Sequence, residues 1–377
     1  MNYHTLGKTG ERLSILGFGI MRLTRDPEQP DRINRKLANE IVRYAIDHGV
    51  NYFDTAQNYS AGESESVLGE ALRGRREQVK IATKVGLWHT RNGLPGIEAH
   101  LTSQLQRLET GHIDFYMIHA LTDARWKVFK EIGLLDFLDR KKREGILRHV
   151  GFSYHGSPAF YQEVIGAWDW EFTQIQFNYV DRYIQAGEAG LVTAHRRGVD
   201  TIIMEPLRGG QLVREVHPAI RQVLHEANPD KTLAQWALEY LWNRPEVDLV
   251  LSGMTTMADV RENIALAEQA GVGMLTEQEV AALEKAGVIY QSLIRVPCTL
   301  CRYCEGCPQG IDIARIMRLY YNSATLDPVV ARRQYQELVS QSKECIDCGM
   351  CEVVCPQDIR ITEVFREAAA FFASDGT

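Results

Sequence analysis

The feature that most constrains the fold is an alternation of short apolar runs with stretches of helical spacing. The apolar runs lie at residues 16–19, 51–54, 79–84, 113–119, 149–153, 172–176, 199–204 and 248–251. The helical spacing lies at residues 38–48, 63–72, 97–108, 134–144, 159–165, 188–197, 233–243, 257–270 and 276–286. Repeated strand and helix units over about 250 residues predict an α/β chain folded as a (β/α)8 TIM barrel.

Two further patterns bear on this prediction. Residues 3–6 and 12–16 flank Gly-Lys-Thr-Gly and predict a hairpin before the first buried strand. The rival fold is a doubly wound sheet, which calls for a glycine-rich phosphate loop after its first strand. Residues 17–22 do not complete the GxGxxG pattern of such a loop, so the barrel is favoured.

Charge and hydropathy exclude several classes of partner. The 377 residues include 42 Lys and Arg against 49 Asp and Glu, and no stretch concentrates basic residues with interleaved aromatics. Nucleic acid is therefore not an expected partner. The first residues lack the apolar core of a signal peptide, and no run of about eighteen apolar residues provides a membrane helix. We expect a cytoplasmic protein without a membrane partner.

All eight cysteines follow residue 297 and form two tight groups, which marks a separate module. The first group has the pattern CxxCxxCxxCP and the second CxxCxxCxxxCP, which is the pattern of bacterial ferredoxins. We predict two [4Fe-4S] clusters in a small, mainly helical, ferredoxin-like domain over residues 291–377, after a barrel domain over residues 1–290. The predicted ligands are Cys298, Cys301, Cys304, Cys307, Cys345, Cys348, Cys351 and Cys355.

The two cysteine groups resemble an internal repeat. Cys-Pro-Gln-Gly-Ile-Asp-Ile at 307–313 recurs as Cys-Pro-Gln-Asp-Ile-Arg-Ile at 355–361, and each copy is predicted to enter a helix. By analogy with two-cluster ferredoxins, Cys355 joins the first three cysteines and Cys307 joins the other three. Structural zinc is the alternative, although CxxCxxC leaves a surplus thiolate. Disulfides conflict with the missing secretion signal.

Four polar residues follow predicted strands on one rim of the barrel: Asp54, Tyr59, Lys84 and His119. Singly, each has an ordinary structural explanation, such as a helix cap or a packed ring. Together they form a proton-donating set, because an ammonium lowers the pKa of a nearby phenol and a carboxylate keeps that ammonium charged. Tyr59 can then protonate a carbonyl oxygen while a nicotinamide delivers hydride to the carbon.

Residues 3 to about 290 resemble the aldo/keto reductase family, and the whole chain resembles its branch with a C-terminal iron-sulfur domain. The matching motifs are residues 51–56 with Tyr59, Gly62-Glu-Ser-Glu with Leu68-Gly, Thr83-Lys84, Ile118-His119, Gly151-Phe-Ser, Gln174-Ile-Gln, Pro206-Leu with Gly209, and Arg261-Glu-Asn. The resemblance implies a barrel that binds NADPH or NADH without a Rossmann fold. It also implies that Asp54, Tyr59, Lys84 and His119 are the catalytic tetrad.

The resemblance further implies a set of cofactor-binding residues. In order, they surround the nicotinamide ribose, the carboxamide and ring, the pyrophosphate and the adenosine end. The residues are Gly19, Ile20, Met21, Arg22, Ser153, Tyr154, Gln174, Met204, Glu205, Pro206, Leu207, Gly209, Gly253, Met254, Thr255, Thr256, Asp259, Glu262 and Asn263.

The chain departs from the family pattern at three of these positions. Met204 stands where many members stack a tyrosine on the nicotinamide, and Tyr154 stands where asparagine commonly follows serine. The family's arginine for the 2′-phosphate falls on Asp259, which favours NADH, whereas the family as a whole, with Arg22 or Arg261, favours NADPH. The choice of nucleotide stays open at this point.

Two functions follow from the sequence. The first is reduction of a small aldehyde or ketone, or the reverse oxidation of an alcohol, with the iron-sulfur module structural or redox-responsive. The second is a redox sensor or electron-transfer protein whose barrel binds nicotinamide while the clusters exchange electrons with a protein partner. Trp88, His89, Tyr154 and His155 offer a mixed aromatic and polar lining for a modest carbonyl compound.

Overall fold

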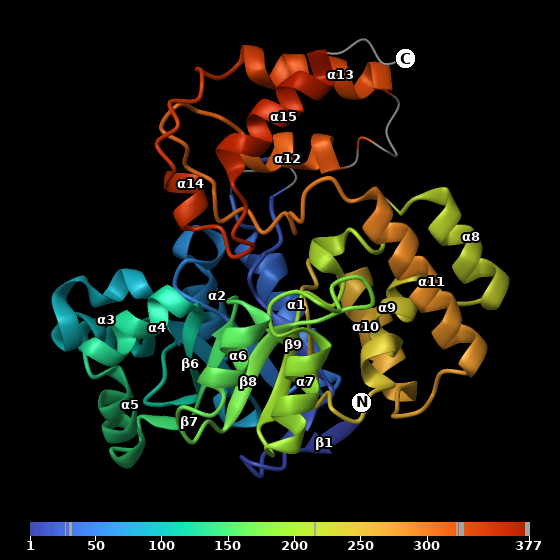
Figure 1. The fold of residues 1–377 in the computed structure, drawn as a ribbon. Helices are drawn as coiled ribbons and strands as arrows, with labels where there is room; N and C mark the ends of the chain where they lie inside the picture. The colour runs from blue at the N-terminus through green and yellow to red at the C-terminus, as the bar shows by residue number, and fades with distance from the viewer. Residues whose placement is uncertain (27, 30–31, 215, 322, 324–327, 374–377) are drawn as a thin grey trace. The chain divides into compact units, whose positions relative to one another are not determined.

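The fold is a closed barrel of parallel strands with helices around it (Figure 1). The computed structural model describes residues 1–377 except 27, 30–31, 215, 322, 324–327 and 374–377. The barrel order is β10-β3-β4-β5-β6-β7-β8-β9, which confirms the predicted TIM barrel and excludes the doubly wound sheet. The strands are β3 (Leu16–Gly19), β4 (Tyr52–Asp54), β5 (Lys80–Val85), β6 (Ile113–Leu121), β7 (Leu147–Tyr154), β8 (Phe172–Gln176), β9 (Asp200–Met204) and β10 (Leu249–Ser252).

Helices lie between successive strands, as the spacing predicts. They are α1 (Arg35–Asp47), α2 (Ser64–Ala71), α3 (Gly93–Arg107), α4 (Asp123–Glu131), α5 (Leu134–Arg143), α6 (Pro158–Val164), α7 (Gly187–Arg196), α8 (Pro218–Ala227) and α9 (Leu233–Trp242), and α10 (Met257–Gln269) and α11 (Glu277–Leu293) follow the last strand. Short 3-10 helices add η1 (Tyr59–Gly62), η2 (Arg76–Gln78), η3 (Leu87–Asn92) and η4 (Arg208–Gly210). Helices α4 and α8 are not among the helices predicted from the sequence.

A hairpin closes the amino-terminal end of the barrel. Strands β1 (Tyr3–Thr5) and β2 (Arg12–Ser14) pair antiparallel, which confirms the predicted hairpin. Leu6 and Leu13 are 1% and 0% exposed and pack with Tyr52, Phe115 and other barrel-lining side chains in one apolar cluster. The barrel interior is therefore a packed core whose floor is sealed by the hairpin.

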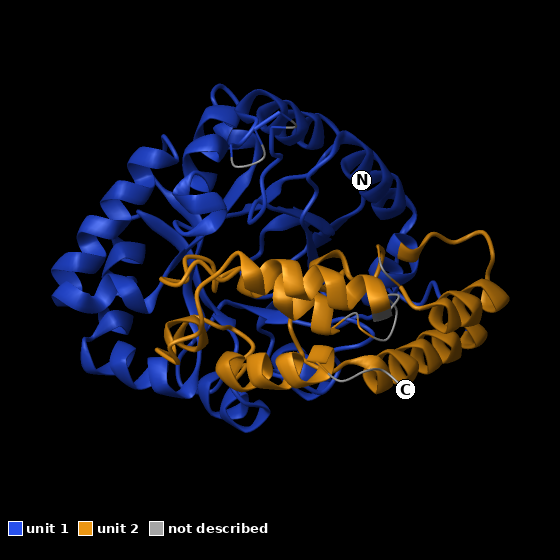
Figure 2. Cartoon of the chain, turned by 90° about the horizontal axis from the view of Figure 1, so that it is seen from above, with its two compact units in different colours: residues 1–206, 234–276 blue, residues 207–233, 277–377 orange. Residues whose placement is uncertain are grey.

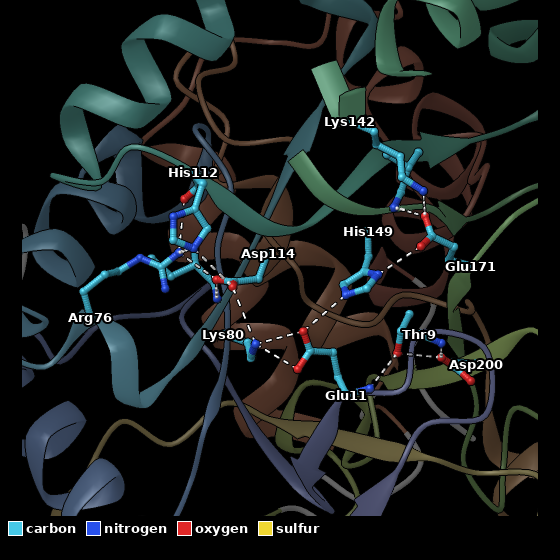
Figure 3. A network of polar contacts seen from close by, with 12 residues as sticks. Thr9, Glu11, Arg76, Lys80, His112, Asp114, Lys142, His149, Glu171 and Asp200 are labelled. Atoms are coloured by element: carbon cyan, nitrogen blue, oxygen red, sulfur yellow. Dashed lines mark hydrogen bonds and ion pairs between the residues drawn. The ribbon is translucent and has the colours of Figure 1, made fainter. Parts of the chain in front are cut away.

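A polar network lies at the amino-terminal ends of the strands (Figure 3). Glu11, beside β2, accepts a hydrogen bond of 2.8 Å from Lys80 Nζ and pairs at 3.3 Å with His149 Nε2. The other ring nitrogen of His149 lies 2.9 Å from Glu171, which also pairs with Lys142. These contacts tie the hairpin to β5, β7 and the start of β8 at the end of the barrel that serves stability.

The chain divides into two compact units (Figure 2). The first holds residues 1–206 and 234–276 with all the barrel strands, and the second holds residues 207–233 and 277–377. The predicted helix after each cysteine group is confirmed, because α12 (Ile313–Tyr321) and α15 (Ile361–Ala373) begin there. The second unit also contains α13 (Pro328–Ser340) and α14 (Met350–Val353). Across the described residues, no helix combines the length and apolar character that a membrane crossing requires.

Candidate active site

Three neighbouring strands and one short helix position the predicted tetrad. Asp54 is the last residue of β4, Lys84 lies near the end of β5, and His119 lies near the end of β6. Tyr59 opens η1, which follows β4. The carboxyl ends of parallel barrel strands meet at one rim, so these side chains share one face. All four are buried, with between 1% and 6% of their surface exposed.

The contacts among the four side chains are close. Lys84 Nζ donates to both carboxylate oxygens of Asp54 and to the carbonyl of Thr55, each at 2.7 Å. The same nitrogen lies 4.8 Å from the centre of the Tyr59 ring, and the Tyr59 and His119 rings are 6.0 Å apart in an edge-to-face arrangement. The structure therefore brings the four residues together, as the strand-end pattern predicts.

Burial controls the charge states within this group. Burial raises the pKa of Asp54 and lowers the pKa of Lys84, while the attraction between them opposes both shifts. For His119, burial and then the nearby Lys84 charge hold the pKa well below its usual value. A neutral imidazole thus stands beside a buried ion pair at neutral pH.

A second set of buried polar residues holds the backbone of Lys84, and the sequence analysis missed it. Gln104 Nε2 donates to the Lys84 carbonyl at 3.1 Å and to Glu65 Oε1 at 2.8 Å. Glu65 is fully buried and also bonds Thr83 Oγ1 and Arg107. The available signal was a polar stripe on one face of α2 and α3, which resembles a solvated face in sequence.

Aromatic residues after β5 stand beside His119. The Trp88 ring is 5.4 Å from the His119 ring and is 37% exposed, and His89 stacks on His100 at 3.3 Å. Burial lowers the pKa of His89 to about 3, so its ring is neutral. Trp88 thus offers an apolar surface at the edge of the tetrad.

The residues expected around the nicotinamide fall into two groups. Gln174 is 2% exposed; its amide nitrogen lies 3.8 Å from Met204 Sδ, and its buried Oε1 has no hydrogen-bond partner among the described residues. Ser153 Oγ accepts from the Ala120 N–H at 2.8 Å, which fixes the chain just after His119. By contrast, the buried Tyr154 side chain packs against Phe160 and Tyr161 of α6, and its hydroxyl donates to the Ser157 carbonyl.

An unpaired buried amide oxygen fits a nicotinamide carboxamide, whose NH2 group can donate to it. The positions expected for the ribose lie at the end of β3, where Ile20 N donates to the Asp54 carbonyl at 2.8 Å and Met21 O accepts from Ser60 Oγ. The first unit therefore provides an acceptor oxygen on Gln174 for the carboxamide and a fixed stretch of backbone at Ile20 and Met21 for the ribose. These residues fit the predicted nucleotide.

The residues expected at the adenosine end surround the start of α10. Thr256 caps this helix, and Asp259 Oδ2 accepts from the backbone N–H groups of Thr255 and Thr256 at 3.2 and 3.0 Å. Asn263 is buried and donates to Ser252 Oγ at 2.8 Å. Backbone N–H groups at the start of a helix commonly bind phosphate. Here the Asp259 carboxylate accepts hydrogen bonds from two such groups, those of Thr255 and Thr256.

The pyrophosphate segment leads into a left-handed turn. Glu205 and Arg208 have positive φ angles of 56° and 49°, and Gly209 and Gly210 follow with 65° and 91°. The step from Leu207 into left-handed Arg208 places successive backbone N–H groups in the curved arrangement that favours anions. This local geometry fits a phosphate group beside residues 207–209.

The eight cysteines lie in the second unit, in loops except for Cys351 in α14, and none forms a disulfide. Burial, and then the nearby Cys298, Cys355 and Cys351, raise the pKa of Cys304 to about 12, so thiols of the second group lie near the first group. Among the described residues, no three His, Cys, Asp or Glu side chains stand close enough to hold one metal ion. Eight soft thiolates at ferredoxin spacing nevertheless suit iron-sulfur clusters.

Comparisons with known proteins match both parts of the chain. A model of the Aldo/keto reductase family matches residues 15–287, and a model of the 4Fe-4S dicluster domain matches residues 297–360. The chain is 26% identical over 317 residues to the uncharacterized oxidoreductase YqkF of Bacillus subtilis, across 75% of this chain and 96% of that protein. It is 24% identical over 304 residues to the NADH-specific methylglyoxal reductase of Escherichia coli, across 69% and 91%.

Among solved structures, the holo form of aldo-keto reductase AKR11C1 from Bacillus halodurans is similar, with a TM-score of 0.63 and 26% sequence identity. The similarity covers 76% of this chain and 96% of that one. The uncovered part of this chain leaves room for the C-terminal cysteine module.

Proposed function

The chain belongs to the aldo/keto reductase family and carries a C-terminal 4Fe-4S dicluster domain, and on that premise we propose that it interconverts a small aldehyde or ketone and its alcohol with NADPH or NADH. One observation carries the proposal: the Lys84 ammonium, bonded to Asp54 at 2.7 Å, stands 4.8 Å from the Tyr59 ring beside neutral His119. This arrangement suits proton donation to a carbonyl oxygen.

The proton in this reaction comes from the Tyr59 hydroxyl. The nicotinamide, when bound, supplies the hydride that adds to the carbonyl carbon. Tyr59 gives its proton to the oxygen, and the Lys84 charge stabilises the phenolate that is left. Asp54 keeps Lys84 charged despite its burial, because it accepts two of the ammonium's hydrogen bonds. In the oxidising direction the same phenolate takes the proton back.

His119 and Trp88 orient the substrate in this proposal. A neutral imidazole can hydrogen-bond a carbonyl oxygen without adding a charge that competes with the Tyr59 proton. Trp88 lies edge to face with His119 and covers it with apolar surface. We expect a compact carbonyl compound, because the aromatic surface offers packing rather than an ionic handle.

The nucleotide would be held by Gln174 and Ser153 at the carboxamide and by Asp259 and Asn263 at the adenosine end. The unpaired Gln174 Oε1 supports the first contact. Asp259 supports a preference for NADH, since its carboxylate already occupies the Thr255 and Thr256 N–H groups and repels a 2′-phosphate. The similarity to an NADH-specific reductase is in line with this preference.

Replacing Tyr59 with phenylalanine tests the proposal. The variant should lose about 10²- to 10⁴-fold in kcat for aldehyde reduction, because the proton donor is gone. Nucleotide affinity, measured by quenching of nicotinamide fluorescence, should stay unchanged. Tyr183→Phe is the matched control, since Tyr183 is 77% exposed. A Tyr59→Phe enzyme with unchanged turnover would refute the role of the tetrad.

A second candidate is electron exchange with a protein partner through the cysteine module. Cys345 and Cys348 are exposed, and the neighbouring Ile346, Met350 and Val353 are 59%, 58% and 76% exposed. An exposed cluster loop with apolar neighbours favours access by a one-electron carrier. Anaerobic reduction of the clusters by reduced ferredoxin, followed by optical bleaching, tests this candidate; clusters reducible only by small dyes argue against it.

A further inference from the structure

The turn at Arg208 is anchored by its own side chain within the second unit. Arg208 is 1% exposed, and its Nη1 donates to the Tyr321 hydroxyl at 2.9 Å and to Gln211 Oε1. Its guanidinium also lies 5.8 Å from the Tyr290 ring and 5.3 Å from the Tyr321 ring. A buried guanidinium that is hydrogen-bonded and stacked in this way has little freedom to move.

This anchoring maintains a backbone that is unfavourable for a residue with a side chain. Arg208 has φ of 49°, a conformation that costs on the order of 1–3 kcal/mol for residues other than glycine unless the surroundings impose it. The surroundings that impose it are α11 through Tyr290 and α12 through Tyr321. The turn at residues 207–209, which the family resemblance assigns to the pyrophosphate, is thus held in its conformation by helices α11 and α12 of the same unit.

Gln211 extends the same contacts to a predicted cluster ligand. Its amide oxygen accepts from Arg208, and its amide nitrogen donates to the Cys298 carbonyl at 2.9 Å. Gln211 is 7% exposed, so both ends of its amide are fixed inside the unit. Cys298 Sγ in turn accepts from the Leu300 N–H at 3.4 Å. A continuous chain of bonds runs from the turn at residues 207–210 to the Cys298 thiol loop.

We propose that Arg208 and Gln211 couple nucleotide binding at the 207–209 turn to the reduction potential of the cluster held by Cys298. This proposal rests on the proposed nucleotide-binding function. Because Arg208 is held rigidly, a displacement of the turn is transmitted through Arg208 and Gln211 to the Cys298 carbonyl and to the N–H group that bonds its sulfur. Hydrogen bonds and charge near cluster sulfurs set the reduction potential.

The sign of the effect follows from charge. The pyrophosphate adds negative charge to the turn, and negative charge disfavours adding an electron to a cluster already surrounded by thiolates. Nucleotide binding therefore lowers the potential. By reciprocity, the oxidised protein binds the nucleotide more tightly than the reduced protein. Within the second unit, the iron-sulfur module then adjusts nucleotide binding at the 207–209 turn to the cell's redox state.

The test uses the full chain with its clusters assembled and a nucleotide that carries no electrons. ADP-ribose and 2′-phospho-ADP-ribose present the pyrophosphate without the nicotinamide ring. Potentials are measured by dithionite titration monitored by EPR, with and without saturating nucleotide, and affinity is measured by calorimetry. We expect a coupling of at least about fivefold. That coupling is a fall of about 40 mV, since tenfold equals about 59 mV for one electron.

Two pairs of variants identify the route. Gln211→Met removes both amide contacts, and Gln222→Met is its control because Gln222 is an exposed residue of α8 that donates to Glu226 on the same helix. Tyr321→Phe removes the hydroxyl that accepts from Arg208, and Tyr320→Phe is its control on the same helix. The shift should shrink most in Gln211→Met, shrink less in Tyr321→Phe, and persist in full in both controls.

Each other outcome overturns the proposal. Binding of the nucleotide by the wild type without any change in potential or EPR signal disproves the coupling but leaves the proposed function standing. A shift that is undiminished in Gln211→Met and Tyr321→Phe disproves the route. Failure of the wild type to bind NADH, NADPH or either analogue removes the proposed function together with this inference.

Discussion

At the residue scale, the site depends on two opposite charges kept out of water. Asp54 and Lys84 are 3% and 1% exposed, so each has lost its hydration and depends on the other. The attraction between them is what keeps an ammonium beside Tyr59. Burying such a pair costs stability because both groups lose their hydration. Removing one partner destabilises the fold further, because the other charge is then buried without compensation.

Asp54→Asn should therefore weaken both activity and folding. The variant leaves Lys84 buried without its counter-charge, which typically costs about 3–5 kcal/mol in the free energy of unfolding. Urea denaturation measures the loss. Asp169→Asn is the control, because Asp169 is 86% exposed in its pair with Lys8 and should cost no more than about 1 kcal/mol. Equal losses in the two variants would contradict the importance of burial.

Asp259 determines the nucleotide preference in our proposal. Asp259→Asn keeps an acceptor for the Thr255 and Thr256 N–H groups but removes the negative charge. The ratio of kcat/KM for NADPH to that for NADH should rise about fivefold, because a repulsion of about 1 kcal/mol is removed. Asp312→Asn, which changes a similar backbone-bonded carboxylate at the start of α12, should leave the ratio unchanged. A wild type that strongly prefers NADPH would refute this role of Asp259.

At the element scale, the hairpin and the starts of the strands depend on ion pairs. Glu171 is partly buried, and its hydrogen bonds with His149 and Lys142 outweigh the opposing effect of burial and hold its pKa near 2. The ordinary value for this carboxyl is 4.5. Because the folded state holds the proton less tightly than the unfolded state, Glu171 stabilises the fold above pH 4.5 or so and loses that effect as pH falls toward 2.

The pH dependence of unfolding should show this carboxylate. Between about pH 4.5 and pH 2, wild-type stability should fall more steeply than that of Glu171→Gln, by up to about 1.4 kcal/mol per pH unit. Chemical denaturation at a series of pH values measures both slopes. Glu131→Gln, a change of an exposed residue at the end of α4, should follow the wild type. Parallel curves for wild type and Glu171→Gln would show that the network contributes nothing at this residue.

The elements also show what a sequence can and cannot predict. All eight barrel strands were predictable, because apolar runs such as residues 113–119 are bounded by turns and separated by helical spacing. Helix α4 was missed because five of the nine residues of Asp123–Glu131 are charged and only Trp126 and Phe129 are buried. Helix α8 was missed because it packs on α11, a partner far along the chain.

The candidate site divides in the same way. Asp54, Lys84 and His119 were predictable because strand ends in a barrel meet at one rim. The bonds of Gln104 with Glu65 and of Arg208 with Gln211 were not, because they join residues whose polar character resembles that of solvent-exposed positions. Only the packing shows that these side chains are buried and paired.

At the scale of the whole molecule, the cysteines are confined to one part of the chain. The barrel strands carry none of them, and the second unit carries all eight. Cys355 is separated from Cys304 by more than forty residues, yet its charge contributes to the raised pKa of Cys304. Cys351 contributes as well, so the two cysteine groups lie close together, and the exchange of the fourth ligand between them stays a prediction.

Single serine substitutions test the exchange. Cys355→Ser and Cys301→Ser should alter the same EPR signal, whereas Cys307→Ser and Cys348→Ser should alter the other. Each substitution should lower the iron content toward about four atoms per chain, half of the value expected for two clusters. Pairing of Cys355 with Cys348 in one signal would show that each group binds its own cluster.

The sealed floor of the barrel also affects the kinetics. With Leu6 and Leu13 packed beneath the lining side chains, nothing passes through the cylinder from one end to the other. In the proposed reaction, the alcohol and the oxidised nucleotide must therefore leave by the same rim at which the substrates enter. Whichever of the two lies deeper at that rim has to leave second, so product-inhibition patterns should reveal a compulsory order of release.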